Sequence, residues 1–193
     1  MSHSLPTTPA VSYDPAGRPV LRTARLTLSA MEPSDAPAIA SLAGDKRVFD
    51  KTLLIPHPYE LRHAHEWIAS HATQWQRWKQ DWTANWAIRL DGAMIGAIGL
   101  VGAAAHRRAE LGYWVGAPHW GNGYASEAAA AVVAFARDVL GAKRLEAGVF
   151  VGNEASRRVL QKCGMREECI RRARYIKNGV HVDEHFLAVV FDG

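Results

Sequence analysis

The sequence has few of the features that mark a secreted, membrane-spanning or metal-binding protein. Only two of its 193 residues are cysteines, Cys163 and Cys169, which are too few for a disulfide framework and lack the spacing of a metal site. The longest apolar run, Ala128 to Ala136, is far shorter than the ~20 residues that cross a bilayer. The N-terminus lacks the charged and then apolar pattern of a secretory signal. We therefore expect a cytoplasmic protein with free thiols, no metal and no membrane partner.

A strong excess of either charge is also missing. Lys and Arg number 23 and Asp and Glu 19, a net charge of +4 with His neutral, and this modest excess does not indicate a nucleic-acid partner. Basic residues nevertheless outnumber acidic ones between Arg137 and Lys177, where Arg157, Arg158 and Lys162 share one predicted helix. This region is either a solvated face or a docking surface for an anionic cofactor. We favour the cofactor, because the region follows the glycine loop described below.

The composition predicts one globular domain behind a flexible N-terminal extension. Hydrophobic residues make up 48% of the chain and both charge signs are present, as in soluble folded proteins. A chain of this length suffices for one domain with a sizeable core. Residues 1–19 carry four prolines among small polar residues. We therefore expect a mobile extension over residues 1–19 and a single domain over residues 20–193.

Hydrophobic spacing in the first half predicts strands around two helices. A first strand is expected at residues 25–28, followed by a short helix with Ser34 as its N-cap. A longer helix is expected to carry Pro58 in its first turn. Strands at residues 85–90 and 93–101 join at Asp91-Gly92, a strong hairpin signal. Glycines within the second of these strands, at positions 96 and 99, indicate a bulge or the close approach of another group.

The second half predicts a β-loop-α-β-α unit and a final hairpin. We expect a strand at residues 110–115, a helix at 124–140, a strand at 144–151 and a helix at 154–163 that stops at Gly164. Asn178-Gly179 is expected to turn the last hairpin, which ends in residues 187–191. The sequence contains no internal repeat. The predicted fold class is therefore mixed α/β, with a mostly antiparallel sheet flanked by helices.

The stretch from Trp120 to Ala125 is the most informative feature of the chain. Its two glycines leave room for backbone N–H groups to close on an oxyanion, and the following helix directs its positive N-terminal end there. A second helix begins at Asn153 after another apolar strand, an order that suggests a nucleotide-bearing cofactor. The loop lacks the third glycine of a dinucleotide fingerprint, although Glu146 lies near the ribose-binding distance. A loop that binds no phosphate is the alternative.

Five sequence blocks together resemble the GNAT superfamily of acyl-CoA N-acyltransferases, and most of all its RimJ- and RimL-type protein N-terminal acetyltransferases. The blocks follow one another in family order and extend over nearly the whole chain after residue 20. They are LRTARLTL at residues 21–28, IGAIGL at 95–100, ELGYWV at 110–115, WGNGYASEA at 120–128 and NEASRRVLQKCG at 153–164. The resemblance implies the GNAT fold, with acetyl-CoA as co-substrate and no metal.

The resemblance also implies where acetyl-CoA binds. Its pyrophosphate would lie on the amides of residues 121–125, with Trp120 replacing the Gln or Arg that commonly begins this motif. The pantetheine arm would run beside the splayed end of the strand at residues 113–115, where a backbone N–H would polarise the thioester carbonyl. Asn153 would bond the pantetheine amide. The expected contact residues are Tyr113, Trp114, Val115, Trp120, Gly121, Asn122, Gly123, Tyr124, Ala125, Asn153 and Arg157.

Two residues are expected to take part in the chemistry. Glu110 is the candidate base that removes the amine proton, through water, because family carboxylates at this strand face the acceptor. The alternative is a surface or salt-bridged glutamate. Many relatives carry a proton-donating tyrosine where this chain has Leu160, so Ser156 is the candidate donor to the leaving sulfur. The alternative is that Ser156 only bonds the backbone at a helix start.

Two further clusters leave their role open. Four tryptophans fall on one side of a helix if it continues far enough, and they are either core or one wall of the acceptor groove. Three residues of the last strand share one face, where a solvated or core strand is favoured over a metal site. The tryptophans are Trp67, Trp75, Trp78 and Trp82, and the strand residues are His181, Asp183 and His185.

The expected function is transfer of acetyl from acetyl-CoA directly to a primary amine, in a ternary complex and without a covalent enzyme intermediate. The leading acceptor is the N-terminal amine of a protein or peptide. The alternatives are a small amine such as an antibiotic or polyamine, a non-catalytic acyl-CoA-binding module and, more remotely, a dinucleotide-dependent oxidoreductase. The sequence leaves the oligomeric state open, with a homodimer as one alternative.

Overall fold

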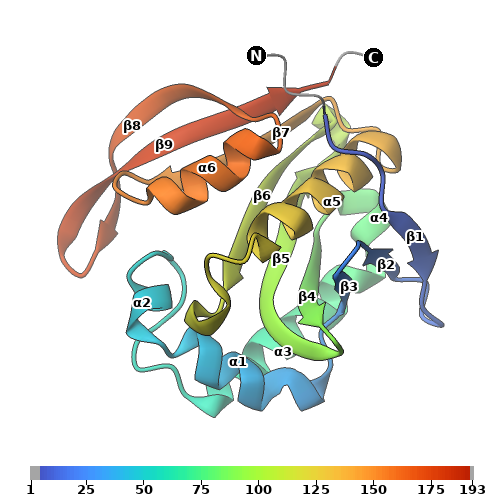
Figure 1. Ribbon diagram of the computed structural model, residues 1–193, viewed down its shortest axis with the longest axis horizontal. Helices are drawn as coiled ribbons and strands as arrows, with labels where there is room; N and C mark the ends of the chain where they lie inside the picture. Colours follow the sequence, from blue (N-terminus) through green and yellow to red (C-terminus); the bar gives the residue numbers. More distant parts are fainter. Residues whose placement is uncertain (1–4, 192–193) are drawn as a thin grey trace.

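The computed structural model describes residues 5–191 and arranges nine strands of that part of the chain in one open sheet (Figure 1). The order across the sheet is β1-β2-β3-β4-β5-β6-β7-β9-β8. Neighbouring strands are antiparallel except for β6 and β7, which are parallel. The strands are β1 (Ala10–Tyr13), β2 (Pro19–Arg22), β3 (Leu26–Ala30), β4 (Ala84–Leu90), β5 (Ala93–Ala103), β6 (Arg108–Val115), β7 (Arg144–Phe150), β8 (Arg166–Lys177) and β9 (Val180–Val190).

Helices cover both faces of this sheet and complete the predicted mixed α/β class, which is confirmed. The unit from β6 through α5, β7 and α6 is the β-loop-α-β-α unit expected from the sequence. Figure 1 shows α5 and α6 on the face of the sheet turned toward the viewer. The helices are α1 (Ala36–Ala43), α2 (Lys46–Phe49), α3 (Leu61–Gln76), α4 (Trp78–Asp81), α5 (Tyr124–Asp138) and α6 (Glu154–Lys162).

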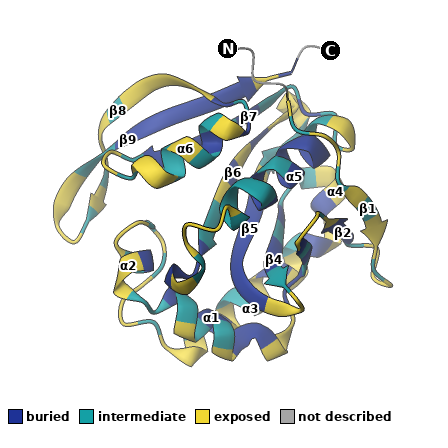
Figure 2. Ribbon diagram, viewed as in Figure 1, coloured by how far each residue is buried: buried dark blue, intermediate teal, exposed yellow. Residues whose placement is uncertain are grey.

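Alternate side chains of the central strands enter two separate cores. On β4, Trp86 and Ile88 belong to a large core with Phe135 of α5, whereas Ala87 between them packs into a smaller core with Ile39 of α1. This alternation is the two-residue period of a strand that is buried on both faces. Figure 2 shows the central strands buried and the edge strand β8 largely exposed. The functional groups on β6 are therefore sorted to one face or the other by their position in the strand.

The N-terminal segment differs from the flexible extension that the prolines suggested. Residues Ala10–Tyr13 form β1, which pairs with β2 at the edge of the sheet, and β2 itself begins at Pro19. The side chains of β1 are mostly exposed, so they carry no alternating hydrophobic pattern from which a strand could be predicted. An edge strand tolerates the neighbouring prolines because one of its sides needs no ladder hydrogen bonds.

The predicted N-cap at Ser34 is wrong. Residues Pro33–Asp35 form a short 3-10 turn, and α1 begins directly after Asp35. The Asp35 carboxylate accepts a hydrogen bond from the backbone N–H of Glu32 at 2.8 Å. It also accepts two hydrogen bonds of 2.7 Å from Arg89. The buried Asp35 therefore anchors this turn to β4, whereas Ser34 was expected to cap the helix.

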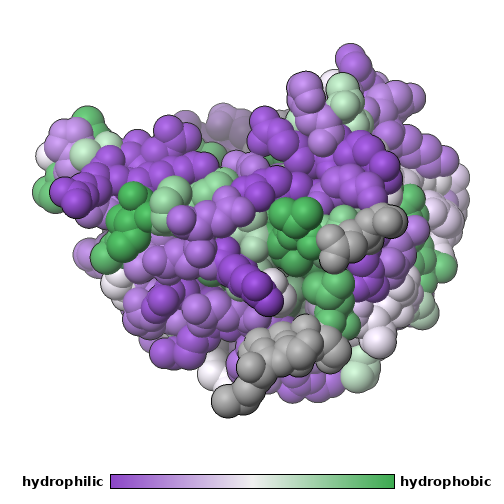
Figure 3. Space-filling view, turned by 90° about the horizontal axis from the view of Figure 1, so that it is seen from above, coloured by the Kyte–Doolittle hydropathy of each residue, from purple (hydrophilic) through white to green (hydrophobic). Residues whose placement is uncertain are grey.

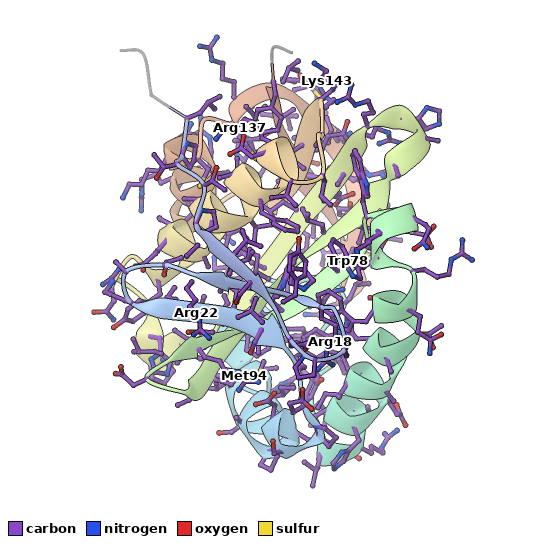
Figure 4. The ribbon with its side chains drawn as sticks, turned by 90° about the vertical axis from the view of Figure 1, so that its right-hand side faces the viewer. Arg18, Arg22, Trp78, Met94, Arg137 and Lys143 are labelled. Atoms are coloured by element: carbon purple, nitrogen blue, oxygen red, sulfur yellow. The ribbon has the colours of Figure 1, made fainter. Side chains whose placement is uncertain are left out.

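The start of α3 and the row of tryptophans also differ from the prediction. Helix α3 begins at Leu61, so Pro58 lies in the preceding loop. The helix ends before the row is complete, and Trp82 adopts a left-handed backbone conformation after α4. Trp75 and Trp78 are buried in the large core, and Figure 4 labels Trp78. The core interpretation is therefore confirmed for these two tryptophans.

The glycines of β5 mark a close approach of other groups, as predicted. A Cβ atom on Gly96 would lie 2.3 Å from the carbonyl oxygen of Trp114, and one on Gly99 would lie 1.9 Å from Oδ1 of Asn85. Neither position can hold a side chain without displacing its neighbour. The missing side chain at Gly96 thus lets the backbone of β6 lie close, and the one at Gly99 leaves room for the Asn85 side chain of β4.

The surface at the top of the molecule, as it is oriented in Figure 1, is mainly hydrophilic. Figure 3 shows charged and polar groups over most of this face, with hydrophobic ones gathered in small groups. Between residues 5 and 191, no helix is both long and apolar enough to cross a membrane.

Candidate active site

The site lies where the two parallel strands separate. Strands β6 and β7 pair only at their first residues, and the last pair is Glu110 with Glu146. Beyond it, β6 stays paired with β5 as far as Val115, and β7 stays paired with β9 as far as Phe150. The sheet is therefore open on one side of each strand, and a cavity of about 750 Å³ lies there, lined by both.

Strand β6 presents different chemistry on its two faces. Tyr113 points toward α6, where its hydroxyl bonds Ser156. Its neighbour Trp114 points the other way, toward α3, where its ring lies 6.3 Å from that of Trp67. By the same alternation Glu110 shares the face of Trp114. The opening between β6 and β7 thus connects an acidic and aromatic side with a hydroxyl-bearing side.

The glycine loop forms the wall of a second cavity, of about 350 Å³. Gly121 and Gly123 have φ angles of +80° and +81°, a conformation that side-chain-bearing residues rarely adopt. Helix α5 starts at Tyr124 without a side-chain cap, so its first-turn N–H groups are free for a ligand. Arg158 and Lys162 of α6 line the same cavity. Free amides, a helix N-terminus and two cations suit a phosphate-bearing ligand.

Two polar residues of the loop brace its backbone. The indole N–H of Trp120 donates to the carbonyl oxygen of Val115 at 2.6 Å. The side-chain amide of Asn122 donates to the carbonyl oxygens of His119 and Trp120 at 3.3 and 3.1 Å. Trp120 also lines the second cavity, whereas Asn122 is not among its lining residues. Among the predicted contact residues, Asn122 is therefore placed to shape the loop rather than to face its ligand.

Asn153 and Arg157 differ in how they are placed. Asn153 caps α6, accepting a 3.4 Å hydrogen bond from the backbone of Ser156, and it lines both cavities. Arg157 pairs with Glu154 and Glu167, both at 3.0 Å, and lines neither cavity. The structure thus does not bring Arg157 to the other predicted contact residues. Arg158 and Lys162, which are one helical turn apart on α6, line the second cavity instead.

The hydroxyl groups of Tyr113 and Ser156 form a pair that the sequence analysis did not foresee. Their oxygens lie 2.7 Å apart, and both residues line both cavities. Burial raises the pKa of the Tyr113 phenol well above its ordinary value, despite the opposing hydrogen bond to Ser156. The phenol therefore stays protonated and remains a hydrogen-bond donor. The sequence signal was a tyrosine next to Trp114, on a strand already assigned to the site and on the face opposite Glu110.

Glu110 lies at the point where the strands separate and lines the larger cavity. Although Glu110 is exposed, partial desolvation of its carboxyl raises the pKa, and the nearby Glu184 and Glu146 raise it further, against the effect of Arg171 and Arg174. Within residues 5–191, Glu146 and Glu184 form ion pairs with arginines, whereas Glu110 forms none. This placement favours a general base over a salt-bridged glutamate, because a raised pKa strengthens the carboxylate as a proton acceptor.

Aromatic and aliphatic side chains form much of the larger cavity on the acceptor side. Trp67 lines it opposite Trp114, as does the loop at residues 51–56. Trp67 is thus the one tryptophan of the predicted row whose position suits the wall of a groove. Lys177, next to the tip of the β8–β9 hairpin, donates to the carbonyl oxygen of Thr52 at 2.6 Å and joins the hairpin to that loop.

Among residues 5–191, His181, Asp183 and His185 of β9 do not share a common partner. Asp183 accepts a 2.7 Å hydrogen bond from the backbone of Ala173, and His185 lies buried with Nδ1 3.1 Å from Glu167. In the part of the chain that the structure describes, no three metal-ligating side chains are grouped for an ion. The hydrogen bond from Ala173 to Asp183 instead ties β9 to its neighbour β8.

This fold and site define a GNAT acyltransferase. Residues 25–166 match the family model described as "Acetyltransferase (GNAT) domain". The chain therefore belongs to this family and is an acetyl-CoA-dependent N-acetyltransferase. The assignment leaves no place for the dinucleotide-dependent oxidoreductase or the non-catalytic module among the alternatives.

Individual relatives agree with this assignment. The uncharacterized N-acetyltransferase YoaA of Bacillus subtilis (strain 168) is 34% identical over 175 residues, which cover 89% of this chain and 97% of YoaA. The ribosomal α-N-protein acetyltransferase RimL, solved with coenzyme A, has a TM-score of 0.79 at 19% identity over 90% of this chain and 98% of RimL. Spermidine N-acetyltransferase from Vibrio cholerae, solved with coenzyme A and spermine, has a TM-score of 0.73 at 20% identity over 87% of this chain and 96% of that protein. The two solved structures show the shared fold.

Proposed function

We propose that this enzyme acetylates the N-terminal α-amine of a protein or peptide. The observation that carries the proposal is the larger cavity, which is wide, reaches Glu110 and has aromatic and aliphatic walls such as Trp67 and Trp114. A peptide end presents one amine and a chain of mixed side chains, which such walls can accommodate. RimL, which shares the fold, is named for action on a protein α-amine.

Glu110, which has no arginine partner within residues 5–191, suits an α-amine as its acceptor. An α-ammonium has a pKa of about 8, more than two units below that of a lysine ammonium. A carboxylate whose pKa is raised by partial desolvation, as at Glu110, can remove a proton from this more acidic ammonium more readily than from an alkyl ammonium. At neutral pH the free-energy cost of deprotonating the acceptor is therefore small.

The two faces of β6 divide the reaction between them. The neutral amine attacks the thioester carbonyl carbon, forming the C–N bond and breaking the C–S bond, while Glu110 accepts one amine proton through water. A backbone N–H at Trp114 or Val115 stabilises the oxyanion. Ser156, on the other face, donates a hydrogen bond to the departing sulfur. The thiolate takes a proton from solvent when coenzyme A leaves, and Glu110 returns its proton to solvent.

The pyrophosphate of coenzyme A is proposed to bind at the second cavity. The amides of residues 121–125 and the side chains of Arg158 and Lys162 would hold it. The pantetheine arm would then extend along Tyr113, Trp114 and Asn153, which line both cavities. This path brings the thioester to the strand separation without any rearrangement of the sheet.

A small polycationic amine is the second candidate acceptor. Glu66 is an exposed carboxylate that lines the same cavity as Glu110. Of the three glutamates that line this cavity, Glu184 pairs with Arg171, whereas Glu66 and Glu110 form no ion pair within residues 5–191. Two such carboxylates suit a ligand with two separated positive charges, and spermidine N-acetyltransferase shares the fold. The predominance of apolar side chains around them favours the peptide.

Thiol release from acetyl-CoA distinguishes the two acceptors. The enzyme is assayed with pooled peptides that carry free N-termini, with the same peptides after N-terminal blocking, with polyamines and with aminoglycosides. We expect turnover with the free peptides and its loss on blocking. Turnover confined to polyamines or aminoglycosides would replace the proposal by the second candidate.

A further inference from the structure

The sequence block at residues 21–28 takes no part in the chemistry, yet it contacts the glycine loop directly. Arg25, between β2 and β3, donates from Nη1 to the carbonyl oxygen of Asn122 at 3.1 Å. Its guanidinium lies over the ring of Tyr124, 4.6 Å from the centroid. A Cβ atom on Gly123 would lie 3.6 Å from Nη2 of the same guanidinium. One arginine thus contacts Asn122 and Tyr124 and lies beside Gly123 between them.

The first turn of α5 holds this arginine in place. Glu127 accepts hydrogen bonds from the backbone N–H of Arg25 at 2.9 Å and from its Nε at 2.7 Å. The hydroxyl of Thr23 donates to the same carboxylate at 2.6 Å. Although burial opposes it, these hydrogen bonds lower the pKa of Glu127, so the carboxylate stays ionised. The β2–β3 turn, the loop and α5 are therefore joined through one charged group.

We propose that Arg25 is a positioning residue for coenzyme A, which holds the loop at residues 121–124 in its anion-binding conformation. The inference rests on the proposed binding of the pyrophosphate at this loop. Two left-handed glycines make the loop costly to order, because glycine loses the most conformational freedom on folding. A loop ordered before the ligand arrives spares that loss at the moment of binding.

Arg25 acts through the loop rather than as a phosphate ligand. It lines neither cavity, and Glu127 already occupies much of its guanidinium through a 2.7 Å ion pair. The cations that line the second cavity are Arg158 and Lys162. The geometry of the guanidinium fork therefore matters more than its charge, since a single ammonium cannot reach the loop carbonyl and the carboxylate in the same way.

Binding of coenzyme A to three variants tests this role. Arg25→Ala and Arg25→Lys are compared with Arg22→Ala by calorimetric titration with coenzyme A alone. Arg22 is the matched control because it is also exposed and lies on the adjacent strand (Figure 4). Within the described chain its side chain forms one hydrogen bond, of 3.4 Å, to the hydroxyl of Thr27. We expect Kd to rise about tenfold or more in both Arg25 variants and to stay unchanged in the control.

A truncated donor separates positioning from a loss of overall structure. S-acetylpantetheine lacks the pyrophosphate, so kcat/KM with this donor should be unchanged in Arg25→Ala while kcat/KM with acetyl-CoA falls about tenfold. An equal fall with both donors, or wild-type affinity in Arg25→Lys, would overturn the positioning role.

Gly123→Val serves as the reference for the loop itself. If it weakens binding and Arg25→Ala does not, only the role of Arg25 fails. If Gly123→Val also binds normally, the proposed coenzyme A site fails with it.

Discussion

The hydroxyl oxygens of Tyr113 and Ser156 lie 2.7 Å apart and join strand β6 to helix α6 at the meeting point of the two cavities. The resemblance to GNAT enzymes implied a proton-donating tyrosine at the position of Leu160. Leu160 is buried and cannot donate a proton. A phenol reaches the same region here from the opposite element. It keeps its proton, since burial raises its pKa, and therefore holds Ser156 by a hydrogen bond rather than by proton transfer.

Loss of the Ser156 hydroxyl should slow the chemical step. In Ser156→Ala we expect the single-turnover rate to fall roughly tenfold to a thousandfold, with acetyl-CoA affinity nearly unchanged. The cap of α6 is Asn153 rather than Ser156, so stability should fall only by the ~1 kcal/mol of one hydrogen bond. The exposed Ser41 of α1 gives the control variant Ser41→Ala. A lowered melting temperature with a wild-type rate would leave Ser156 a purely structural role.

Removal of the Tyr113 hydroxyl should have a smaller effect of the same kind. Tyr113→Phe leaves the ring packing intact and frees Ser156 to rotate, so we expect turnover to fall by about tenfold. Because the two hydroxyls are in contact, the double variant with Ser156→Ala should lose less than the product of the two single effects. Independent effects in this double-mutant cycle would show that Tyr113 does not act through Ser156.

A side chain at Gly123 should disrupt coenzyme A binding. Its φ of +81° strains any branched residue by about 1–3 kcal/mol, and the added carbons would occupy the approach to the loop amides. We expect Gly123→Val to weaken acetyl-CoA binding at least tenfold by calorimetry. Gly92→Val is the matched control, because Gly92 has a φ of +84° and open space around it in the β4–β5 turn. Equal affinities of the two variants would remove the loop from the binding site.

Replacement of Glu110 should lower activity in a pH-dependent way. We expect Glu110→Gln to reduce turnover on the order of a hundredfold or more at pH 7, with acetyl-CoA affinity nearly unchanged. The deficit should shrink at high pH, where more of the acceptor amine is already neutral. Full activity of the variant at pH 7 would transfer the role to another group or to an amine that binds already neutral.

The same variant should change how stability depends on pH. The folded-state pKa of Glu110 is raised by partial desolvation, so its protonated form is favoured in the folded protein. The stability that this provides is present below the ordinary pKa of about 4.3 and is lost as the pH rises through the raised value. Glu110→Gln cannot ionise and escapes this loss. Its melting temperature relative to wild type should therefore be higher at pH 8 than at pH 4, and an offset that is constant with pH would contradict the raised pKa.

Much of this architecture could be predicted because local patterns and tertiary structure agree. The hairpin at Asp91-Gly92, the strand at residues 110–115 and the helix after the glycine loop each carry a periodicity or turn signal that packing preserves. Strand β1 could not be predicted in this way, because its exposed residues gain their order from pairing with β2.

The site was predictable as a region but not in its contacts. Helical spacing cannot tell which of Arg157, Arg158 and Lys162 faces a cavity, because ion pairs with residues of the following strand decide that. The bonds of Arg25 and Tyr113 join residues 97 and 43 positions apart in the sequence. Such contacts follow from how the sheet and helices pack, which no local pattern specifies.

We expect acetyl to pass to an α-amine at the point where β6 and β7 separate. Mass spectrometry on a peptide that carries both a free N-terminus and an internal lysine tests it most directly, after incubation with acetyl-CoA and either wild-type enzyme or Glu110→Gln. We expect acetyl on the N-terminal amine with the wild-type enzyme, none on the lysine, and little product with the variant. Acetyl on the lysine side chain, or equal N-terminal product from the two enzymes, would contradict this expectation.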